Sequence, residues 1–278
     1  PFEWLLSSTS SAASTSLNGN ANVNGNANAN ANANTNTNGN GGPRPISAIL
    51  VTGSAAAAYD KANNPWIQPL QEFLQRVYVD YPAVKILGSC FGHQIIAQAL
   101  LDPTQQPKQQ QQALQKQELQ KQTGLKVEAC PHGYEIGVLP IALSEEFVCA
   151  FPRLARYIKS KHDGQGEKQQ TLKIQVIHGD RVVSTSDSGS LPSGWINIGH
   201  TAISPIHGLF NPHRVLTYQG HFEFDAFVSR ETCLAFGRKG KWPAEQIEKF
   251  IQLIEEGKED DSEVAAEVVV LFLADRTT

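Results

Sequence analysis

The stretch Val84–Gln94, which reads VKILGSCFGHQ, decides the fold of this protein. Its first residues, Val84–Leu87, are mainly apolar, as is typical of a buried parallel strand. His93–Leu101 has apolar residues at helical spacing and is predicted as a helix. The segment GSCFG between them has the form of a nucleophile elbow in which cysteine replaces serine. We therefore interpret Cys90 as a nucleophile at a strand-to-helix turn.

Physical chemistry explains why this turn suits a thiol. A turn this tight strains the backbone of its central residue, and flanking glycines remove side chains that would clash. Cys90 would lie at a helix N-terminus, where the helix dipole and free N–H groups favour the thiolate. The backbone N–H of Phe91 would be placed to bind an oxyanion. The alternative is a buried cysteine in an ordinary strand-to-helix turn.

A second segment, Thr217–Glu223 with sequence TYQGHFE, supplies a base for this thiol. It follows an apolar run, so His221 would leave the carboxyl end of a strand, the edge at which open α/β sheets bind ligands. Glu223 lies two residues further on and can orient the imidazole by a hydrogen bond. A His-x-Glu pair alone is weak evidence for a catalytic base, and it becomes persuasive only together with the nucleophile elbow.

The segments around the elbow predict an α/β protein with a doubly wound, mostly parallel sheet. Ile46–Val51 is an apolar strand that closes on a tight loop, Trp66–Tyr78 is an amphipathic helix, and the elbow strand and helix follow. Further strands are predicted at 125–129, 134–143, 172–177, 195–203 and 215–218. Further helices are predicted at 154–161, 224–236, 244–255 and 262–274.

Composition divides the chain into two regions. Residues 1–45 are predicted to hold a helix remnant, PFEWLL, and an Asn-rich disordered insertion, because Asn alternating with small residues buries no apolar surface. Residues 46–278 are predicted to form one domain that carries a Gln-rich surface insertion at about 103–124. The chain has no methionine, which suggests a fragment or a processed chain.

Charge and cysteine usage exclude several functions. The net charge of −4 comes without a basic stripe, so no nucleic-acid partner is expected. No apolar run approaches the roughly 18 residues of a membrane span, so no membrane partner is expected. The four cysteines lack CxxC spacing, and five histidines (His132, His162, His200, His207 and His213) lack metal-ligand spacing. We therefore expect no metal, no cofactor and a reducing, cytoplasmic setting.

The segments LVTGS (50–54), LGSCFGHQ (87–94) and QGHFEF (219–224) together resemble class I, triad-type glutamine amidotransferases. The chain looks most like stand-alone members of fungi and plants, which are related to the glutaminase domain of GMP synthase. GYEIG (133–137) and HGDRV (178–182) also match, and the resemblance runs in order from Ile46 to Ala274. It implies the flavodoxin-like fold of that family.

The resemblance also implies roles for individual residues. Cys90 would attack the side-chain amide of glutamine and form a γ-glutamyl thioester, with His221 as base and Glu223 as its orienting group. Gly53 and Phe91 would provide the oxyanion N–H groups, and Gln94 would help to hold the amino-acid end of the substrate. His93 would be structural support. His178 and Asp180 would lie near the pocket or in an ordinary turn.

The chain departs from the family pattern in three ways. Phe222 stands where family members often have proline, and the Asn-rich and Gln-rich insertions are additional. The family also has a first strand inside the sheet, followed by a helix, and here that N-terminal strand is missing. We expect its loss to expose two sheet edges.

The resemblance leaves the activity open. A glutaminase would pass ammonia to an acceptor, which requires a separate synthase or acceptor protein. A γ-glutamyl peptidase would cleave glutathione-like compounds without a partner. A papain-like peptidase is disfavoured by the buried strand before Cys90 and by Glu223. A catalytically silent regulatory module is the alternative outside the enzymes.

Overall fold

The computed structural model describes residues 45–104, 124–162, 170–186, 188–257 and 259–277. Nearly all of the predicted helix remnant and Asn-rich insertion (1–45), and most of the Gln-rich insertion (103–124), lie outside these residues. Residues Ala48–Thr278 form one unit by their contacts. This unit contains all the described helices and strands.

A five-stranded sheet forms the centre of this unit, with strand order β1-β2-β10-β9-β7. The strands are β1 (Ala48–Val51), β2 (Lys85–Ser89), β10 (Val215–Tyr218), β9 (Gly208–Asn211) and β7 (Ile196–Asn197). β1, β2 and β10 run parallel to one another. β9 pairs antiparallel with β10, and β7 pairs antiparallel with β9. Among the described residues the sheet has no gap, and β1, which pairs only with β2, forms one edge.

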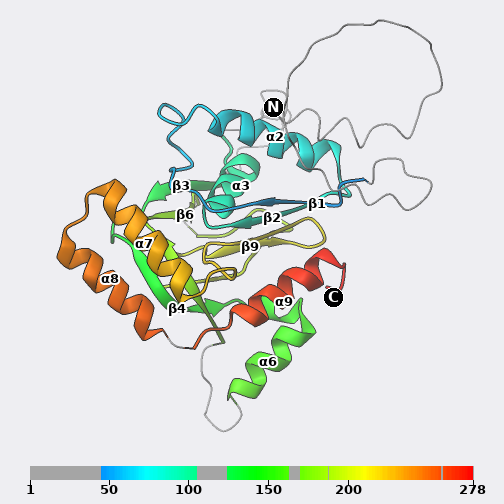
Figure 1. The fold of residues 1–278 in the computed structure, drawn as a ribbon. Helices are drawn as coiled ribbons and strands as arrows, with labels where there is room; N and C mark the ends of the chain where they lie inside the picture. The colour runs from blue at the N-terminus through cyan, green and yellow to red at the C-terminus, as the bar shows by residue number, and fades with distance from the viewer. Residues whose placement is uncertain (1–44, 105–123, 163–169, 187, 258, 278) are drawn as a thin grey trace, which may run out of the picture. The chain divides into compact units, whose positions relative to one another are not determined.

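Helices cover both faces of this sheet (Figure 1). On one face α3 (Phe91–Leu101) packs on β1 and β2, and α2 (Ile67–Asp80) packs on α3. On the other face α9 (Ser262–Leu273) and the short α5 (Glu145–Cys149) share an aromatic core with β9. The predicted doubly wound α/β fold is therefore confirmed. No helix in the described residues has the length and apolar character to cross a membrane.

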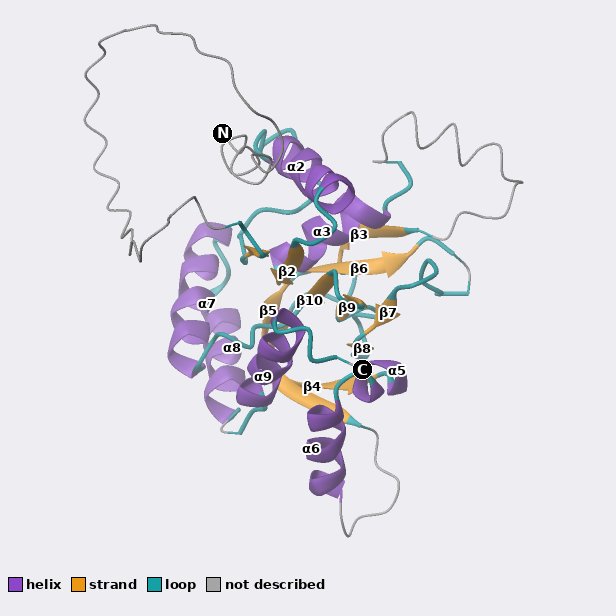
Figure 2. Ribbon diagram, turned by 90° about the vertical axis from the view of Figure 1, so that its right-hand side faces the viewer, coloured by secondary structure: helices purple, strands orange, loops and turns teal. Residues whose placement is uncertain are grey.

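A second layer of strands stands beside the central sheet (Figure 2). β4 (Glu135–Leu143) pairs antiparallel with β5 (Thr171–His178) and with β8 (Gly199–His200). α7 (Ala226–Gly240) contacts β5, and α8 (Ala244–Glu256) contacts β4. The remaining elements are the antiparallel pair β3 (Leu125–Ala129) and β6 (Asp180–Ser184), which contacts α3, and the helix α6 (Pro152–His162).

Most predicted elements occur within a few residues of their predicted bounds, but the segment 195–203 does not. We predicted one strand there, whereas β7 pairs with β9 in the central sheet and β8 pairs with β4 in the second sheet. The prediction is wrong because the apolar pattern of a segment does not reveal a change of sheet within it. The sequence analysis also missed α5, β6 and β9, which are all five residues or shorter.

The glycines of the elbow are required by close backbone approach. A Cβ atom at Gly92 would lie 2.0 Å from the carbonyl oxygen of Val51 in β1. A Cβ atom at Gly88 would lie 2.7 Å from the carbonyl carbon of Gly92. These distances are too short for any side chain, so the elbow joins β1, β2 and α3 only with glycine at both positions.

We expect Gly92→Ala to lower the free energy of unfolding by about 3 kcal/mol, the upper range for overpacking, because the obstacle is backbone rather than a movable side chain. Urea unfolding followed by circular dichroism measures this loss. Gly189→Ala is the control. A Cβ atom at that position would meet no atom within 4 Å, so its only cost is that alanine must adopt the φ of 69° of the glycine. The control should cost about 1 kcal/mol, and equal losses in both variants would contradict the role of the Val51 contact.

Candidate active site

Cys90 has the strained backbone that the elbow predicts. Its φ is 53° and its ψ is −107°, a left-handed conformation that a residue with a side chain rarely adopts. Its amide N–H donates to the carbonyl of Tyr218 in β10 at 2.8 Å, and its own carbonyl accepts from the N–H of Gln94 at 3.1 Å. These bonds hold the side chain where β2 ends and α3 begins, close to the end of β10.

His221 follows the end of β10, so the two predicted reacting groups meet at the carboxyl ends of neighbouring parallel strands, as expected. The backbone N–H of His221 donates to the carbonyl of Gln175 in β5 at 2.7 Å. The Cys90 side chain acts on the pKa of the imidazole, and its Sγ lies 3.9 Å from the carbonyl oxygen of Ile177. Phe224 stacks on the ring with 3.9 Å between centroids and 13° between planes. The ring is therefore fixed by backbone and aromatic contacts.

Glu223 lies beside the imidazole as the His-x-Glu spacing predicts. Its Oε1 accepts a hydrogen bond from Nδ1 of His221 at 2.8 Å. Because a carboxylate oxygen accepts, the contact fixes the proton on Nδ1 and turns Nε2 toward the thiol. Phe222, which stands where the family often has proline, packs against Tyr218 and does not disturb this contact.

The electrostatics of the three groups favour a charged imidazole. Burial acts to lower the pKa of His221, but hydrogen bonds with Cys90 and Glu223 outweigh it and raise the pKa from 6.5 to about 9. Burial acts to raise the pKa of Glu223, but the hydrogen bond from His221 and that from Ser89 hold it below its usual range. The arrangement therefore favours an imidazolium beside an ionised carboxylate near neutral pH.

The predicted oxyanion residues lie next to the thiol. Phe91 is the first residue of α3, so its amide N–H has no acceptor within the helix. A Cβ atom at Gly53 would lie 3.1 Å from Cε1 of His221 and 3.8 Å from Cβ of Cys90. The backbone at Gly53 therefore lies so close to the reacting groups that a Cβ atom there would require His221 to shift by a few tenths of an ångström.

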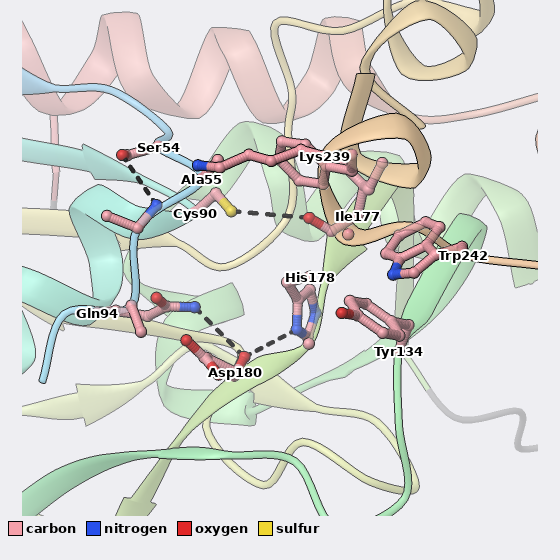
Figure 3. A pocket seen from close by; sticks show the side chains of 15 residues that line it. Ser54, Ala55, Cys90, Gln94, Tyr134, Ile177, His178, Asp180, Lys239 and Trp242 are labelled. Atoms are coloured by element: carbon pink, nitrogen blue, oxygen red, sulfur yellow. Dashed lines mark hydrogen bonds between the residues drawn. The ribbon is translucent and has the colours of Figure 1, made fainter. Parts of the chain in front are cut away.

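Two cavities open on either side of Cys90. The first, of about 340 Å³, contains the polar side chains of Gln94, His178, Asp180 and Lys239 (Figure 3). The second, of about 390 Å³, lies on the side of His221 and Glu223. Both share Ser54, Ala55, Cys90, Ile177 and Phe236 in their walls. The thiol therefore stands where two binding spaces meet.

Gln94 lines the first cavity, as the resemblance implied. Its Nε2 donates to the carbonyl of Asp180 at 3.3 Å and to Oε1 of Gln219 at 3.2 Å. The Asp180 carboxylate accepts from the hydroxyl of Tyr59 at 3.0 Å, and burial raises its pKa. Figure 3 shows Gln94 and Asp180 on the same side of the cavity, away from the sulfur.

The sequence analysis missed part of the cavity wall. Lys239 and Trp242 come from the end of α7 and the loop after it, and Tyr134 contacts Trp242 with 4.7 Å between ring centroids. No local signal in the sequence marks Lys239 or Trp242, because both reach the site through the packing of α7 and α8. Tyr134 could have been predicted from the sequence, since it belongs to the GYEIG segment that matches the family.

His93 lies beneath the elbow and has the contacts of a structural residue. Its Nδ1 lies 2.8 Å from the hydroxyl of Thr217, and its Nε2 lies 3.2 Å from the carbonyl of Ile206. Burial lowers its pKa to about 3, so the ring is neutral. These contacts link α3 to β10 and support the interpretation as structural support.

One group in the described residues has the composition of a metal site. Ligand atoms of Glu135, His178 and His207, all buried, lie within 4.8 Å of one another. Nδ1 of His178 lies 3.0 Å from the carbonyl of Asp180 and must donate to it, while its Nε2 lies 3.2 Å from Oε2 of Glu135. Nε2 of His207 approaches the same oxygen at 3.6 Å.

This group consists of a buried carboxylate in contact with two buried histidines. Burial acts to raise the pKa of Glu135, but hydrogen bonds from both histidines outweigh it and hold the pKa well below its usual range. Glu135 and His178 are direct partners across β4 and β5, so the pair also joins these strands. Spacing along the sequence gave no sign that His207 would complete the group.

Comparisons with known proteins agree with the fold. A glutamine amidotransferase-like protein of Schizosaccharomyces pombe is 29% identical over 186 residues, which cover 66% of this chain and 55% of that protein. A Saccharomyces cerevisiae protein that is also named for glutamine amidotransferases is 26% identical over 228 residues, 81% of this chain and 71% of that one. No protein-family model matches the chain.

A solved structure shows the same fold. The crystal structure of a glutamine amidotransferase from Thermotoga maritima superposes with a TM-score of 0.51 at 16% identity, over 84% of this chain and 80% of that one. The chain is thus a homologue of yeast glutamine amidotransferase-like proteins and has the glutamine amidotransferase fold, which confirms the resemblance. It spans only 55% of the length of its S. pombe relative.

We expect Glu223→Gln to lower the pKa of His221 from about 9 toward 6.5, because the variant removes the negative charge that stabilises the imidazolium. An NMR titration of the His221 imidazole measures the shift. Glu231→Gln, on the exposed side of α7, is the matched control and should leave this pKa unchanged.

The same pKa has a stability consequence of known sign. A histidine whose pKa is raised on folding stabilises the native state fully below its unfolded value and loses this contribution as pH rises through the folded value. The stability difference between the natural protein and His221→Gln should therefore shrink from pH 6.5 to about 9. A constant difference over that window would contradict the assignment.

Proposed function

We propose that this protein is a thiol-dependent hydrolase or amidotransferase that acts on the side-chain amide of glutamine, with Cys90, His221 and Glu223 as its triad. The observation that carries the proposal is that Cys90, His221 and Glu223 line one open cavity, with the imidazole hydrogen-bonded to the carboxylate. Homology to glutamine amidotransferase-like proteins supports the reaction class.

The proposed reaction has two halves. The Cys90 thiolate attacks the amide carbon, and the N–H groups of Gly53 and Phe91 stabilise the oxyanion. His221, already an imidazolium, gives its Nε2 proton to the departing nitrogen, and ammonia leaves a γ-glutamyl thioester. In the second half neutral His221 takes a proton from water, the hydroxide attacks the thioester, and the C–S bond breaks. Glutamic acid leaves and ionises in solvent, which restores the Cys90 thiolate and the His221 imidazolium. Glu223 keeps the proton on Nδ1 throughout.

The first cavity suits the amino-acid end of glutamine. The α-ammonium of the substrate needs an acceptor, and the α-carboxylate needs a cation or N–H donors. Asp180 supplies a carboxylate, Lys239 supplies a cation, and both line the cavity that contains Cys90. Gln94 is held by two hydrogen bonds and is proposed to orient the same end of the substrate.

A glutaminase of this kind would work with a separate synthase or acceptor protein. Glutamine is therefore the proposed small-molecule partner, and an acceptor protein is the proposed macromolecular partner.

A second candidate function, γ-glutamyl peptidase, is favoured by the second cavity. Ammonia is small and needs no pocket, whereas the peptide released from a γ-glutamyl peptide needs space on the leaving-group side. The cavity of about 390 Å³ lies on the His221 side of Cys90 and includes Phe224, Thr232 and Phe236. It is large enough for a peptide residue.

The first test is substrate turnover. We expect the natural protein to release ammonia from glutamine and Cys90→Ala to lose activity by at least about 10⁴-fold, as when other covalent catalysts lose their nucleophile. Ammonia release and thioester trapping with hydroxylamine measure this. Cys149→Ala, an exposed cysteine of α5, is the control and should retain activity. If neither glutamine nor γ-glutamyl peptides are turned over, the enzymatic proposal fails.

The second test separates the two candidates. Thr232→Trp should fill the second cavity and reduce cleavage of γ-glutamyl peptides by roughly tenfold or more, the effect of about 1.4 kcal/mol, with little change for glutamine. Parallel kcat/KM measurements on both substrates decide the question. If the natural protein hydrolyses only glutamine, the peptidase candidate is excluded.

A further inference from the structure

Ser89, the residue before the nucleophile, contacts both partners of the thiol. It is the last residue of β2 and is buried, with 2% of its surface exposed. Its Oγ lies 2.8 Å from Oε1 of Glu223 and 3.4 Å from Nδ1 of His221. Oε1 is the same oxygen that accepts from Nδ1 of His221 at 2.8 Å. Oε1 of Glu223 therefore accepts two hydrogen bonds, one from Ser89 and one from His221.

We propose that Ser89 is a positioning residue that extends the triad to four members, by anchoring the Glu223 carboxylate against His221. The proposal rests on the proposed function of the site, to which it adds one residue. Cys90 and Ser89 then act as a pair, since the end of one strand supplies both the nucleophile and the anchor of its base.

The direction of the hydrogen bonds follows from the donors available. An ionised carboxylate only accepts, so both Ser89 and His221 must donate to Oε1. Because Nδ1 of His221 carries the proton that it donates to Glu223, this nitrogen cannot accept a hydrogen bond from Ser89. The hydroxyl proton of Ser89 is thereby fixed on Glu223.

The anchor is needed because Glu223 is not enclosed. Its side chain is 37% exposed, whereas that of His221 is 4% exposed. Water can therefore compete for the carboxylate and draw it away from the imidazole. Ser89 holds the inner oxygen from a rigid position, because β2 pairs with β1 on one side and β10 on the other, with Ser89 directly opposite Tyr218.

Two effects of Ser89 oppose each other. Its donated hydrogen bond withdraws charge from Oε1, which by itself makes the carboxylate a weaker partner for the imidazolium. Its positioning keeps that carboxylate at 2.8 Å from Nδ1. Positioning should dominate, because a freed, half-exposed carboxylate is solvated and loses most of its interaction with His221. Removing the hydroxyl should therefore lower the pKa of His221 and weaken the base.

The test uses Ser89→Ala with two readouts that need no substrate. We expect the pKa of His221, followed by NMR, to fall below about 9. We also expect alkylation of Cys90 by iodoacetamide at neutral pH to slow by roughly tenfold, since a hydrogen bond to a charged group has about that effect on an equilibrium. Ser89→Thr restores the hydroxyl and should recover both values.

A double-mutant comparison shows whether Ser89 acts through Glu223. In a Glu223→Ala background, Ser89→Ala should cause no further change, because the anchor then holds nothing. An additive effect in that background would overturn the proposal. Ser204→Ala removes the hydroxyl of another buried serine, 1% exposed and outside the triad, and should leave both readouts unchanged.

Turnover measured in parallel separates this inference from the proposed function. A fall in the His221 pKa and in alkylation without any turnover supports the positioning role and contradicts the proposed activity. Turnover that depends on Cys90 but is accompanied by unchanged pKa and alkylation in Ser89→Ala overturns the positioning role alone.

Discussion

The close approach of β1, β2 and α3 at the elbow is the constraint on which the site depends. The carbonyl of Val51 occupies the space that a side chain at Gly92 would need, and the start of α3 is therefore pressed against the end of β1. Cys90 takes up the resulting change of direction with a φ of 53°. Strain of this kind persists only when neighbouring bonds enforce it, and here the carbonyl of Tyr218 does so.

The same neighbour explains how nucleophile and base come together. Tyr218 ends β10, pairs with Ser89 and accepts from the N–H of Cys90, and the chain reaches His221 three residues later. The bond from His221 to Gln175 then ties this turn to the second sheet. The position of the imidazole therefore depends on both the central sheet and the second sheet. A shift of either sheet would change the distance between Cys90 and His221.

Charge is distributed around the thiol in two separate groups. Around His221, a partly exposed carboxylate and a buried serine stabilise the imidazolium. In the wall of the first cavity, Nε2 of His178 lies 3.2 Å from Oε2 of the buried Glu135 carboxylate. The carbonyl of Asp180 accepts from both His178 and Gln94, so this second group is linked to a residue proposed to bind substrate. The short turn from His178 to Asp180 thus contributes both to the contact with Glu135 and to the proposed binding of substrate.

The amino-acid sequence predicts the elbow and the order of most helices and strands, and it singles out Cys90, His221 and Glu223 as candidate reacting groups, because these features depend on local patterns of apolar residues and on motifs a few residues long. It predicted the edge of the sheet at which these residues meet, because parallel strands end together. Tertiary packing produces the change of sheet between β7 and β8, the contact of Ser89 with Glu223, the positions of Lys239 and Trp242 in the cavity wall, and the approach of His207 to Glu135 and His178. Those features join residues distant in the chain, through strand register and helix packing that no local pattern encodes.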